Sequence, residues 1–172
     1  MTAKIIWLTG LSGSGKTTIA KHLNTKLKES GKKVINFDGD EIRSKFNKNL
    51  KFTPQDIKEN NLFILNLCQE YQSSYDYILV PVIAPFKETR DNARKTLSNN
   101  YLEVFVNTPL EECIRRDVKG LYKKALNGGI KNFIGIDSNT PYQEPINPDI
   151  SILTKTTSVE KAVSIILSKL SL

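Results

Sequence analysis

The sequence predicts an α/β fold in which a doubly wound parallel sheet is flanked by helices. Two observations carry this prediction. Short apolar segments alternate along the chain with longer segments of helical periodicity, which is typical of parallel strands joined by crossover helices. In addition, a glycine-rich loop at residues 10–17 follows the first apolar segment and precedes the first amphipathic one. The fold is therefore expected to be of the P-loop NTPase type.

The length and composition of the chain fit a single domain over residues 1–172. This length allows a proper hydrophobic core, and no linker or internal repeat interrupts the sequence. No apolar run approaches the ~20 residues of a membrane helix, and the run at 5–8 is too short for a leader peptide. Cys68 and Cys113 lie far apart and form no metal-ligand pattern. We therefore expect buried free thiols in a cytoplasmic protein that has no membrane partner.

The chain is basic, with a formal net charge of +7 and a pI of about 9.3. Its lysines are scattered along the sequence instead of being massed in one block. Small polyanionic substrates explain the excess charge as well as nucleic acid would, so no stable nucleic-acid partner is expected. The single histidine, His22, lies inside the first predicted helix, where a catalytic or metal-binding role is not expected.

The loop at residues 10–17 fits the pattern G-x-x-x-x-G-K-[ST] of a phosphate-binding loop. Its glycines allow a tight turn whose N–H groups converge on one anion, and the following helix adds its positive N-terminal end. Lys16 is expected to reach the β- and γ-phosphates of ATP, and the Thr17 hydroxyl to ligate Mg²⁺. A glycine-rich turn that merely resembles the motif is the alternative. The expected nucleotide-binding residues are Gly10, Ser12, Gly13, Ser14, Gly15, Lys16, Thr17 and Thr18.

The first helix is predicted over residues 16–30. Ile19, Leu23 and Leu27 recur on one face at helical spacing, and Gly31 follows in the position of a C-terminal cap. An amphipathic helix directly after the loop is the context that a phosphate-binding loop requires.

The next strand is predicted over residues 34–37, and it delivers two carboxylates at its end. Parallel α/β sheets bind ligands at the carboxyl ends of their strands. Asp38 and Asp40, placed near a phosphate loop, are therefore candidates for binding Mg²⁺ and for accepting a proton from the substrate. A solvated Asp-Gly-Asp turn is the alternative. A helical turn follows and directs Arg43 toward the same site.

The rest of the chain continues the alternation. Thr53 and Pro54 form an N-cap followed by a first-turn proline, for a helix that ends near Tyr71. Capping-box patterns that begin at Thr108 and Thr157 predict two further helices. The other predicted elements are strands at 76–82, 101–106 and 150–153 and a polar helix at 87–98.

Two segments show neither strand nor helix periodicity. Residues 119–131 are rich in lysine and glycine, and they predict a mobile lid over anionic ligands, within a lid region of about 117–137. A simple solvated loop is the alternative. Residues 140–148 contain three prolines and are expected to be extended and irregular.

Several separate motifs resemble those of the adenylylsulfate kinase family. They are the pattern Phe-Asp-Gly-Asp-x-x-Arg at 37–43, Lys-Gly-Leu-Tyr-Lys-Lys-Ala at 119–125, Phe-Ile-Gly-Ile-Asp at 133–137, and Asn-Pro at 147–148. The resemblance runs from about Lys4 to Thr154, in the order and spacing of the family. It implies transfer of the γ-phosphoryl group of MgATP to the ribose 3′-hydroxyl of adenylylsulfate.

The resemblance also implies roles for individual residues. Lys16, Asp38 and Asp40 are the implied catalytic residues, with Asp38 accepting the proton of the 3′-hydroxyl and, together with Thr17, contacting Mg²⁺. Arg116 matches a position near the ATP base, and Phe52 and Phe133 match two aromatic residues that sandwich the acceptor base. The implied acceptor-binding residues are Asp38, Arg43, Phe52, Asn60, Ile83, Ala84, Lys119, Leu121 and Phe133. A homodimer is expected by family analogy alone.

Two positions depart from the family pattern. Ile57 stands where the family has an arginine that faces the anionic end of the acceptor, and Ala84 stands where it has a serine. An arginine that binds an anion through two parallel hydrogen bonds is not equivalent to isoleucine. The acceptor therefore stays open between adenylylsulfate and cytidine diphosphoramidate, which a related kinase phosphorylates in bacterial capsule phosphoramidate synthesis.

Other classes of function stay open as well. A kinase of another small metabolite or of polynucleotides would use the same scaffold, although the paired aromatics favour a nucleotide acceptor. A non-catalytic nucleotide-binding module is the remaining alternative. The retention of Asp38, Asp40 and Arg43 argues against it.

Overall fold

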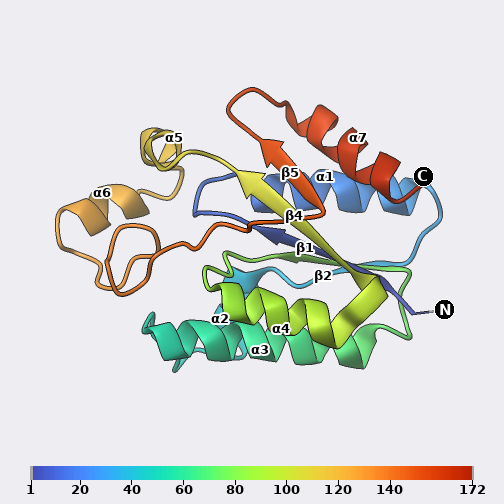
Figure 1. Ribbon diagram of the computed structural model, residues 1–172, viewed down its shortest axis with the longest axis horizontal. Coiled ribbons are helices and arrows are strands. Elements are labelled where there is room, and N and C mark those ends of the chain that lie inside the picture. Colours follow the sequence, from blue (N-terminus) through green and yellow to red (C-terminus); the bar gives the residue numbers. More distant parts are fainter. Residues whose placement is uncertain (1, 172) are drawn as a thin grey trace.

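The computed structural model describes residues 2–171, which form a five-stranded sheet covered by helices on both faces (Figure 1). The strand order is β2-β3-β1-β4-β5, and all the paired strands are parallel. The strands are β1 (Lys4–Thr9), β2 (Val34–Asn36), β3 (Tyr77–Pro81), β4 (Tyr101–Asn107) and β5 (Ile150–Leu153). The helices are α1 (Lys16–Glu29), α2 (Gly39–Lys45), α3 (Pro54–Tyr71), α4 (Lys87–Leu97), α5 (Leu110–Arg116), α6 (Leu121–Leu126) and α7 (Val159–Lys169), with a 3₁₀ turn at Ser98–Asn100.

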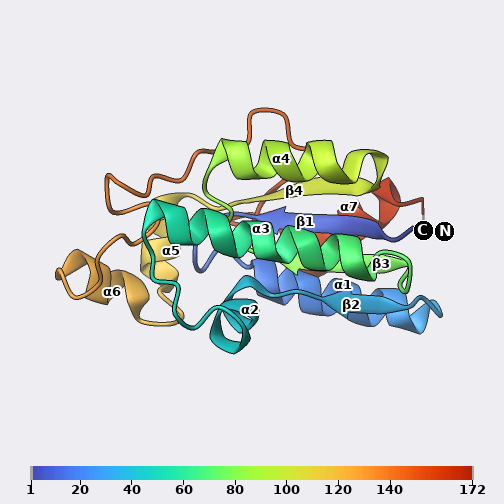
Figure 2. The same cartoon turned by 90° about the horizontal axis from the view of Figure 1, so that it is seen from below.

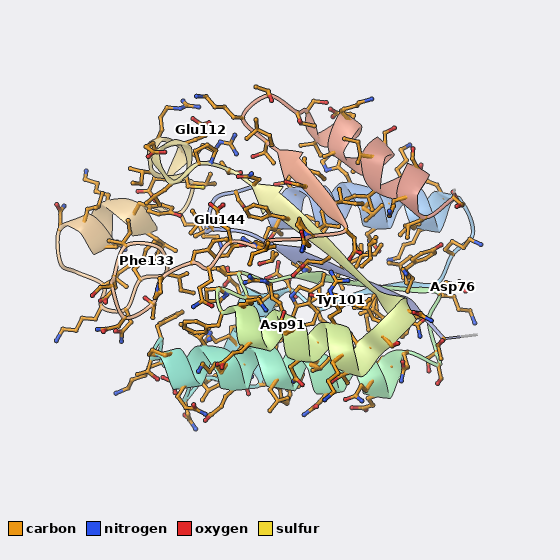
Figure 3. All side chains as sticks on the ribbon, in the orientation of Figure 1. Asp76, Asp91, Tyr101, Glu112, Phe133 and Glu144 are labelled. Carbon is orange, nitrogen blue, oxygen red and sulfur yellow. The ribbon has the colours of Figure 1, made fainter. Side chains whose placement is uncertain are left out.

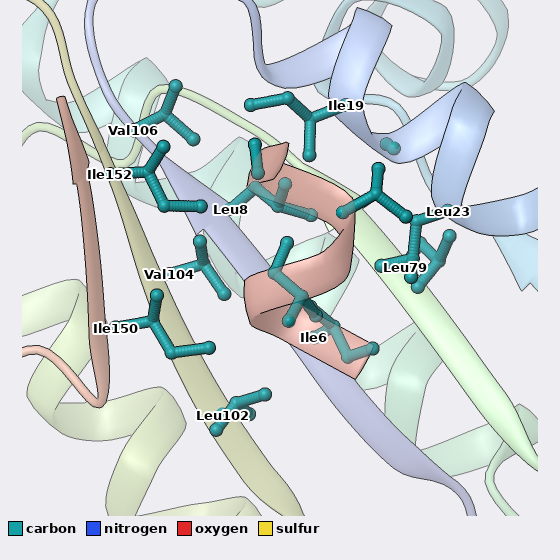
Figure 4. Packing of buried hydrophobic residues seen from close by; sticks show 14 of the residues in the cluster. Ile6, Leu8, Ile19, Leu23, Leu79, Leu102, Val104, Val106, Ile150 and Ile152 are labelled. Carbon is teal, nitrogen blue, oxygen red and sulfur yellow. The ribbon is translucent and has the colours of Figure 1, made fainter. Parts of the chain in front are cut away.

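The central strand β1 is buried on both faces, which explains why its sequence is almost continuously apolar. Ile6 and Leu8 face α1 and α7, where they pack with residues of α1, β4 and β5 (Figure 4). Ile5 and Trp7 face the opposite layer, which α3 and α4 cover. The two hydrophobic cores therefore lie on either side of one strand, as expected for a doubly wound sheet.

The carboxyl ends of the strands gather at one edge of the sheet. In the parallel register, Leu8 pairs with Pro81 and Asn36 pairs with Leu79, so β1, β2 and β3 end close together. The glycine-rich loop leaves β1 at this edge, and α5 and α6 extend beyond it (Figure 1). The two ends of the chain lie at the opposite end of the molecule (Figure 2).

Most of the predicted elements are confirmed, with bounds within one or two residues. Thr53 is the N-cap of α3 and forms a complete capping box with Asp56, and Pro54 occupies the first turn. Gly31 follows Ser30, the C-cap of α1, and adopts a positive φ of 75°. Cys68 and Cys113 are buried free thiols, as the sequence predicts.

The two other predicted capping boxes are wrong. The N-cap of α5 is Pro109, which offers no side-chain cap, because the Thr108 hydroxyl donates to the carbonyl oxygen of Ser14, 3.1 Å away. The N-cap of α7 is Ser158 instead of Thr157, and its hydroxyl accepts from the N–H of Lys161.

The lid segment contains a helix that the sequence analysis did not predict. Helix α6 has only six residues, too few for a periodic pattern, and its start is fixed by Asp117, whose carboxylate accepts from the N–H groups of Tyr122 and Lys123. Tyr122 is buried and packs edge-on against Phe133, with ring centroids 5.0 Å apart. The segment thus has a small core of its own. Its mobility stays a prediction.

Across residues 2–171, no helix is long and apolar enough to cross a membrane. The longest helix, α3, has 18 residues, and its polar residues include Asn60 and Asn61 on the buried face.

Candidate active site

A cavity opens at the carboxyl edge of the sheet, between the glycine-rich loop and the lid. Its walls come from the loop before α1, the turn after β2, the first half of α3, the segment after β3 and the lid. The sequence-predicted residues that line it are Ser12, Gly13, Lys16, Thr17, Asp38, Asp40, Arg43, Phe52, Asn60, Ile83, Ala84, Lys119, Leu121 and Phe133. The fold therefore brings most of the predicted site residues to one place.

The glycine-rich loop is held in shape by contacts that lie far away in the sequence. Gly10 has a φ of 155°, and a Cβ there would lie 2.6 Å from the carbonyl oxygen of Val106, so no other residue fits. The hydroxyls of Thr108 and Thr154 both donate to the carbonyl oxygen of Ser14, each over 3.1 Å. The loop is thus fixed by two neighbouring strand ends.

Lys16 is the buried cation of this loop. Its Nζ donates to the carbonyl oxygen of Leu11 at 2.7 Å and is 3.5 Å from Oγ of Ser14. Burial lowers the pKa of Lys16 to about 8, and the opposing effect of the nearby Asp40 carboxylate is smaller. An anion such as a triphosphate placed in the loop would supply the missing countercharge.

The turn after β2 places Asp38 against the loop. Its Oδ2 accepts from the Thr17 hydroxyl at 2.9 Å, and its Oδ1 accepts from the backbone N–H of Asp40 at 2.9 Å, which caps α2. The close approach requires Gly39, because a Cβ there would lie 2.7 Å from Cγ2 of Val82. Sequence reasoning found the two acids but not this packing requirement.

A hydroxyl and a carboxylate side by side fit the ligand preference of Mg²⁺ for oxygen. Within the described chain, no group of three or more His, Cys, Asp and Glu side chains forms a metal cluster. Magnesium in kinase sites is usually held by one or two protein oxygens together with the phosphates of the nucleotide. Thr17 and Asp38 are therefore the residues that would hold it here.

Asp40 connects the same turn to the lid. Its Oδ2 pairs with Nζ of Lys119 at 2.5 Å, across 79 residues of sequence. Both side chains are largely exposed, 73% for Asp40 and 55% for Lys119. This ion pair brings a positive charge of the lid to the mouth of the phosphate loop.

Two aromatic side chains line the cavity from different elements. Phe52 precedes α3, is 49% exposed, and lies beneath the guanidinium of Arg43, whose carbon is 4.8 Å from the ring centroid. Phe133 belongs to the lid, beside α6 (Figure 3), and is half-buried against Tyr122. Each ring can offer a face or an edge to a base, and whether the two sandwich one stays a prediction.

The wall at the end of β3 has an unusual backbone. Ala84 is buried and has a positive φ of 45°, and its carbonyl oxygen accepts from Nη1 of Arg90 at 2.7 Å. Arg90 is itself buried, pairs with Glu103 at 3.2 Å, and donates through Nη2 to the carbonyl oxygen of Gln143. The buried arginine thus holds the segment after β3 and the irregular segment at 140–148 together.

Ile57 lines the cavity with an apolar surface and is only 2% exposed. It packs in a cluster with Phe86 of the segment after β3 and Ile134 of the lid. One turn later on α3, Asn61 also lines the cavity, a residue that the sequence analysis missed. The only signal for it was its spacing of four residues from Ile57.

Some predicted residues do not line the cavity. Arg116 pairs with Glu112 at 2.8 Å and donates to the carbonyl oxygen of Thr154 at 3.0 Å, so it lies beside the phosphate loop on the β5 side. Its predicted position near the ATP base stays untested. The other predicted nucleotide-binding residues that do not line the cavity are Gly10, Ser14 and Gly15 of the loop and Thr18 of α1.

Three comparisons with known proteins agree. The family model described as adenylylsulphate kinase matches residues 2–153. The adenylyl-sulfate kinase of Clostridium kluyveri is 45% identical over 167 residues, covering 97% of this chain and 83% of that protein. The adenylyl-sulfate kinase of Rippkaea orientalis is 45% identical, with coverage of 96% and 90%. The solved structure of the APS kinase CysC of Mycobacterium tuberculosis, in complex with AMPPNP and APS, superposes with a TM-score of 0.92 at 38% identity, and 99% of each chain is covered.

Proposed function

Because the chain belongs to the adenylylsulphate kinase family and is an ATP-dependent kinase, we propose that it phosphorylates the ribose 3′-hydroxyl of a nucleotide whose 5′-phosphate carries a further acidic group. Adenylylsulfate is the first acceptor proposed, with the 3′-phosphorylated nucleotide and ADP as products. The names of the relatives and the APS bound in the similar solved structure support this choice.

One observation carries the proposal. The phosphate loop, the acid at the end of β2 and the two aromatic rings all face a single cavity. Phosphoryl transfer depends chiefly on positioning the two substrates and on neutralising the charge of the transferred group. A cavity lined both by the residues proposed to bind the triphosphate and by the aromatic residues proposed to stack on the acceptor base would provide that positioning.

The roles of the residues follow from their places. Lys16 and the N–H groups of the loop bind the β- and γ-phosphates, and Lys119 adds positive charge from the lid. Thr17 and Asp38 would hold Mg²⁺, and the ion would supply positive charge that offsets the charge of the phosphate oxygens. The Asp38 carboxylate, whose Oδ1 also caps α2, is proposed to orient the 3′-hydroxyl of the acceptor and to take its proton during transfer to the γ-phosphorus.

A second acceptor is favoured by one specific observation. Ile57 presents a buried apolar side chain to the cavity, at the position where the family pattern has an arginine for the anionic end of the acceptor. Losing a charged hydrogen bond of this kind costs about 1.5–3 kcal/mol, or roughly ten- to a hundredfold in binding. Cytidine diphosphoramidate is therefore proposed as the alternative acceptor.

The test is acceptor-dependent release of ADP from MgATP, with adenylylsulfate and cytidine diphosphoramidate offered separately and with a no-acceptor control. Turnover of either compound supports 3′-phosphorylation of a nucleotide, and the ratio of the two kcat/KM values identifies the preferred acceptor. If neither compound stimulates the release of ADP, the proposed function is overturned. That result would favour a kinase of another metabolite or a nucleotide-binding module.

A further inference from the structure

Thr9, the last residue of β1, connects the start of the phosphate loop to the wall of the cavity. It directly precedes Gly10 and is fully buried. Its hydroxyl donates to the carbonyl oxygen of Ile83 and lies 2.9 Å from the hydroxyl of Tyr142. A carbonyl oxygen can only accept, so the Thr9 proton is used by Ile83, and the Tyr142 hydroxyl must donate to Thr9. The three groups thus form a chain of hydrogen bonds that ends at the cavity wall.

Residues 83–85 form the part of this wall that follows β3, here called the acceptor wall. Each of its three carbonyl oxygens accepts a hydrogen bond from a residue that does not line the cavity. The donors, in the order of the three carbonyls, are the Thr9 hydroxyl, Nη1 of Arg90 at 2.7 Å and the backbone N–H of Gln143 at 2.9 Å. Of these three donors, Thr9 is the one that adjoins the phosphate loop in sequence.

The acceptor wall depends on such support because its middle residue has an unfavourable backbone. Ala84 is buried and has a positive φ of 45°. This left-handed conformation is unfavourable for a residue with a Cβ, and it persists only where the surrounding contacts hold it in place. Loss of one supporting hydrogen bond should therefore allow the acceptor wall to relax and move.

The phosphate loop has supports of its own that do not involve the Thr9 hydroxyl. The hydroxyls of Thr108 and Thr154 hold the carbonyl oxygen of Ser14 from the far side of the loop. Removal of the Thr9 hydroxyl should therefore displace the acceptor wall and leave the loop unchanged. The two halves of the cavity can be disturbed separately in this way.

We propose that Thr9 is a positioning residue for phosphoryl transfer, whose hydroxyl fixes the acceptor wall at the distance from the phosphate loop that in-line attack requires. Thr9 does not itself line the cavity and acts through Ile83. Transfer is sensitive to this distance, because a displacement of about 1 Å can lower a rate roughly a hundredfold. This inference rests on the proposed function, since it takes the acceptor to lie against Ile83 and Ala84.

The test separates the hydroxyl of Thr9 from its shape. Thr9→Val keeps the shape and removes the hydroxyl, whereas Thr9→Ser keeps the hydroxyl. Thr9→Val is expected to lower kcat/KM for the acceptor by at least about tenfold, with an unchanged dissociation constant for a non-hydrolysable ATP analogue. Thr9→Ser should stay close to the wild-type protein in both measurements. The control is Thr25→Val, the same change at an exposed position of α1, and it should alter neither.

Hydrogen exchange followed by mass spectrometry examines the acceptor wall directly, without any substrate. The backbone amides between residues 82 and 86 should exchange faster in Thr9→Val than in the wild-type protein or in Thr9→Ser. Tyr142→Phe keeps the Thr9 hydroxyl but removes the group that donates to it. It should show the same changes in exchange and in kcat/KM to a smaller extent, and it provides the test if Thr9→Val does not fold.

The inference is overturned if Thr9→Val retains the wild-type kcat/KM, or if exchange at 82–86 is unchanged in both Thr9→Val and Tyr142→Phe. An equal loss of activity in Thr9→Ser would overturn it as well, because the methyl group and its packing would then matter. A parallel loss of ATP-analogue binding in Thr9→Val would place the defect in the loop and would also contradict it. Failure of the proposed function has a different signature, namely no ADP release by the wild-type protein with either acceptor, while the exchange measurement decides whether Thr9 holds the wall.

Discussion

The hydroxyl of Thr17 donates to the carboxylate of Asp38 over 2.9 Å, and this hydrogen bond joins the start of α1 to the end of β2. The two residues lie 21 positions apart in the sequence. Their contact brings the two oxygens expected to hold Mg²⁺ to the same point, beside the buried Lys16. Asp38 is also the N-cap of α2, so one side chain serves both the fold and the proposed chemistry.

Asp38→Asn is expected to lower kcat by at least about a hundredfold, because the amide cannot take the proton of the acceptor hydroxyl and binds Mg²⁺ poorly. Asparagine is as good an N-cap as aspartate, so the melting temperature should change little. Coupled ADP release and thermal unfolding are the measurements. Asp91→Asn, the same change on the exposed face of α4, should retain full activity. Turnover close to the wild-type level in Asp38→Asn would contradict the proposed base.

ATP binding is expected to weaken as the pH rises through about 8. Burial lowers the pKa of Lys16 to about 8, so the free protein loses this positive charge above that pH. Binding of the triphosphate above pH 8 then requires Lys16 to take up a proton again, which costs free energy and weakens binding. The dissociation constant of a non-hydrolysable ATP analogue, measured by calorimetry, should increase up to tenfold per pH unit above 8. Lys16→Met should bind weakly at every pH and should lack this steep rise.

The same lysine gives an expectation for stability. Its pKa in the folded protein is lower than the ordinary 10.5, so between about pH 8 and 10.5 the unfolded chain binds more protons than the folded one. The contribution of Lys16 to the free energy of unfolding should therefore increase with pH across that window. Urea unfolding at pH 8 and at pH 10 gives the difference in the free energy of unfolding between the wild-type protein and Lys16→Met. If this difference is the same at both pH values, burial does not lower the pKa of Lys16.

Phe133→Ala is expected to raise the KM for the acceptor with a smaller effect on kcat. Stacking of a base on an aromatic ring contributes about 1–3 kcal/mol, which corresponds to roughly five- to 150-fold in binding. The matched control is Phe46→Ala, since Phe46 is exposed, pairs with Phe63, and does not line the cavity. Steady-state kinetics with varied acceptor decide the question. An unchanged KM in Phe133→Ala would leave the ring with a packing role against Tyr122 alone.

Lys119→Ala is expected to reduce kcat/KM strongly while leaving the stability nearly unchanged. Its ion pair with Asp40 is exposed, and such pairs contribute about 1 kcal/mol or less to folding. Its proposed role, neutralising charge on the transferred phosphoryl group, is lost with the side chain. Lys131→Ala removes an exposed lysine of the same lid that does not line the cavity, and it serves as the control. Equal losses of activity in the two variants would point to the general charge of the lid.

The sequence by itself determined the framework of this protein. Apolar segments, helical periodicity and the cap at Thr53 are local patterns, and they predicted the five strands, the long helices and the parallel sheet. Local patterns also predicted the phosphate-binding loop at 10–17 and the two acids at 38 and 40. Each follows a predicted strand, and parallel sheets bind ligands at the ends of their strands. These features could be predicted since each depends on neighbours within a few residues.

The tertiary structure decided the features that depend on distant partners. The Thr108 hydroxyl bonds to Ser14, 94 residues away, instead of capping its own helix. Helix α6 packs through Tyr122 against Phe133. Its six residues are too few to show a helical pattern of apolar residues in the sequence. The buried oxygen of Asn61 accepts no hydrogen bond from any residue in the range 2–171, and this too depends on the elements packed around it. Hydrogen bonding and burial across long sequence separations are set by packing, and a local pattern does not encode them.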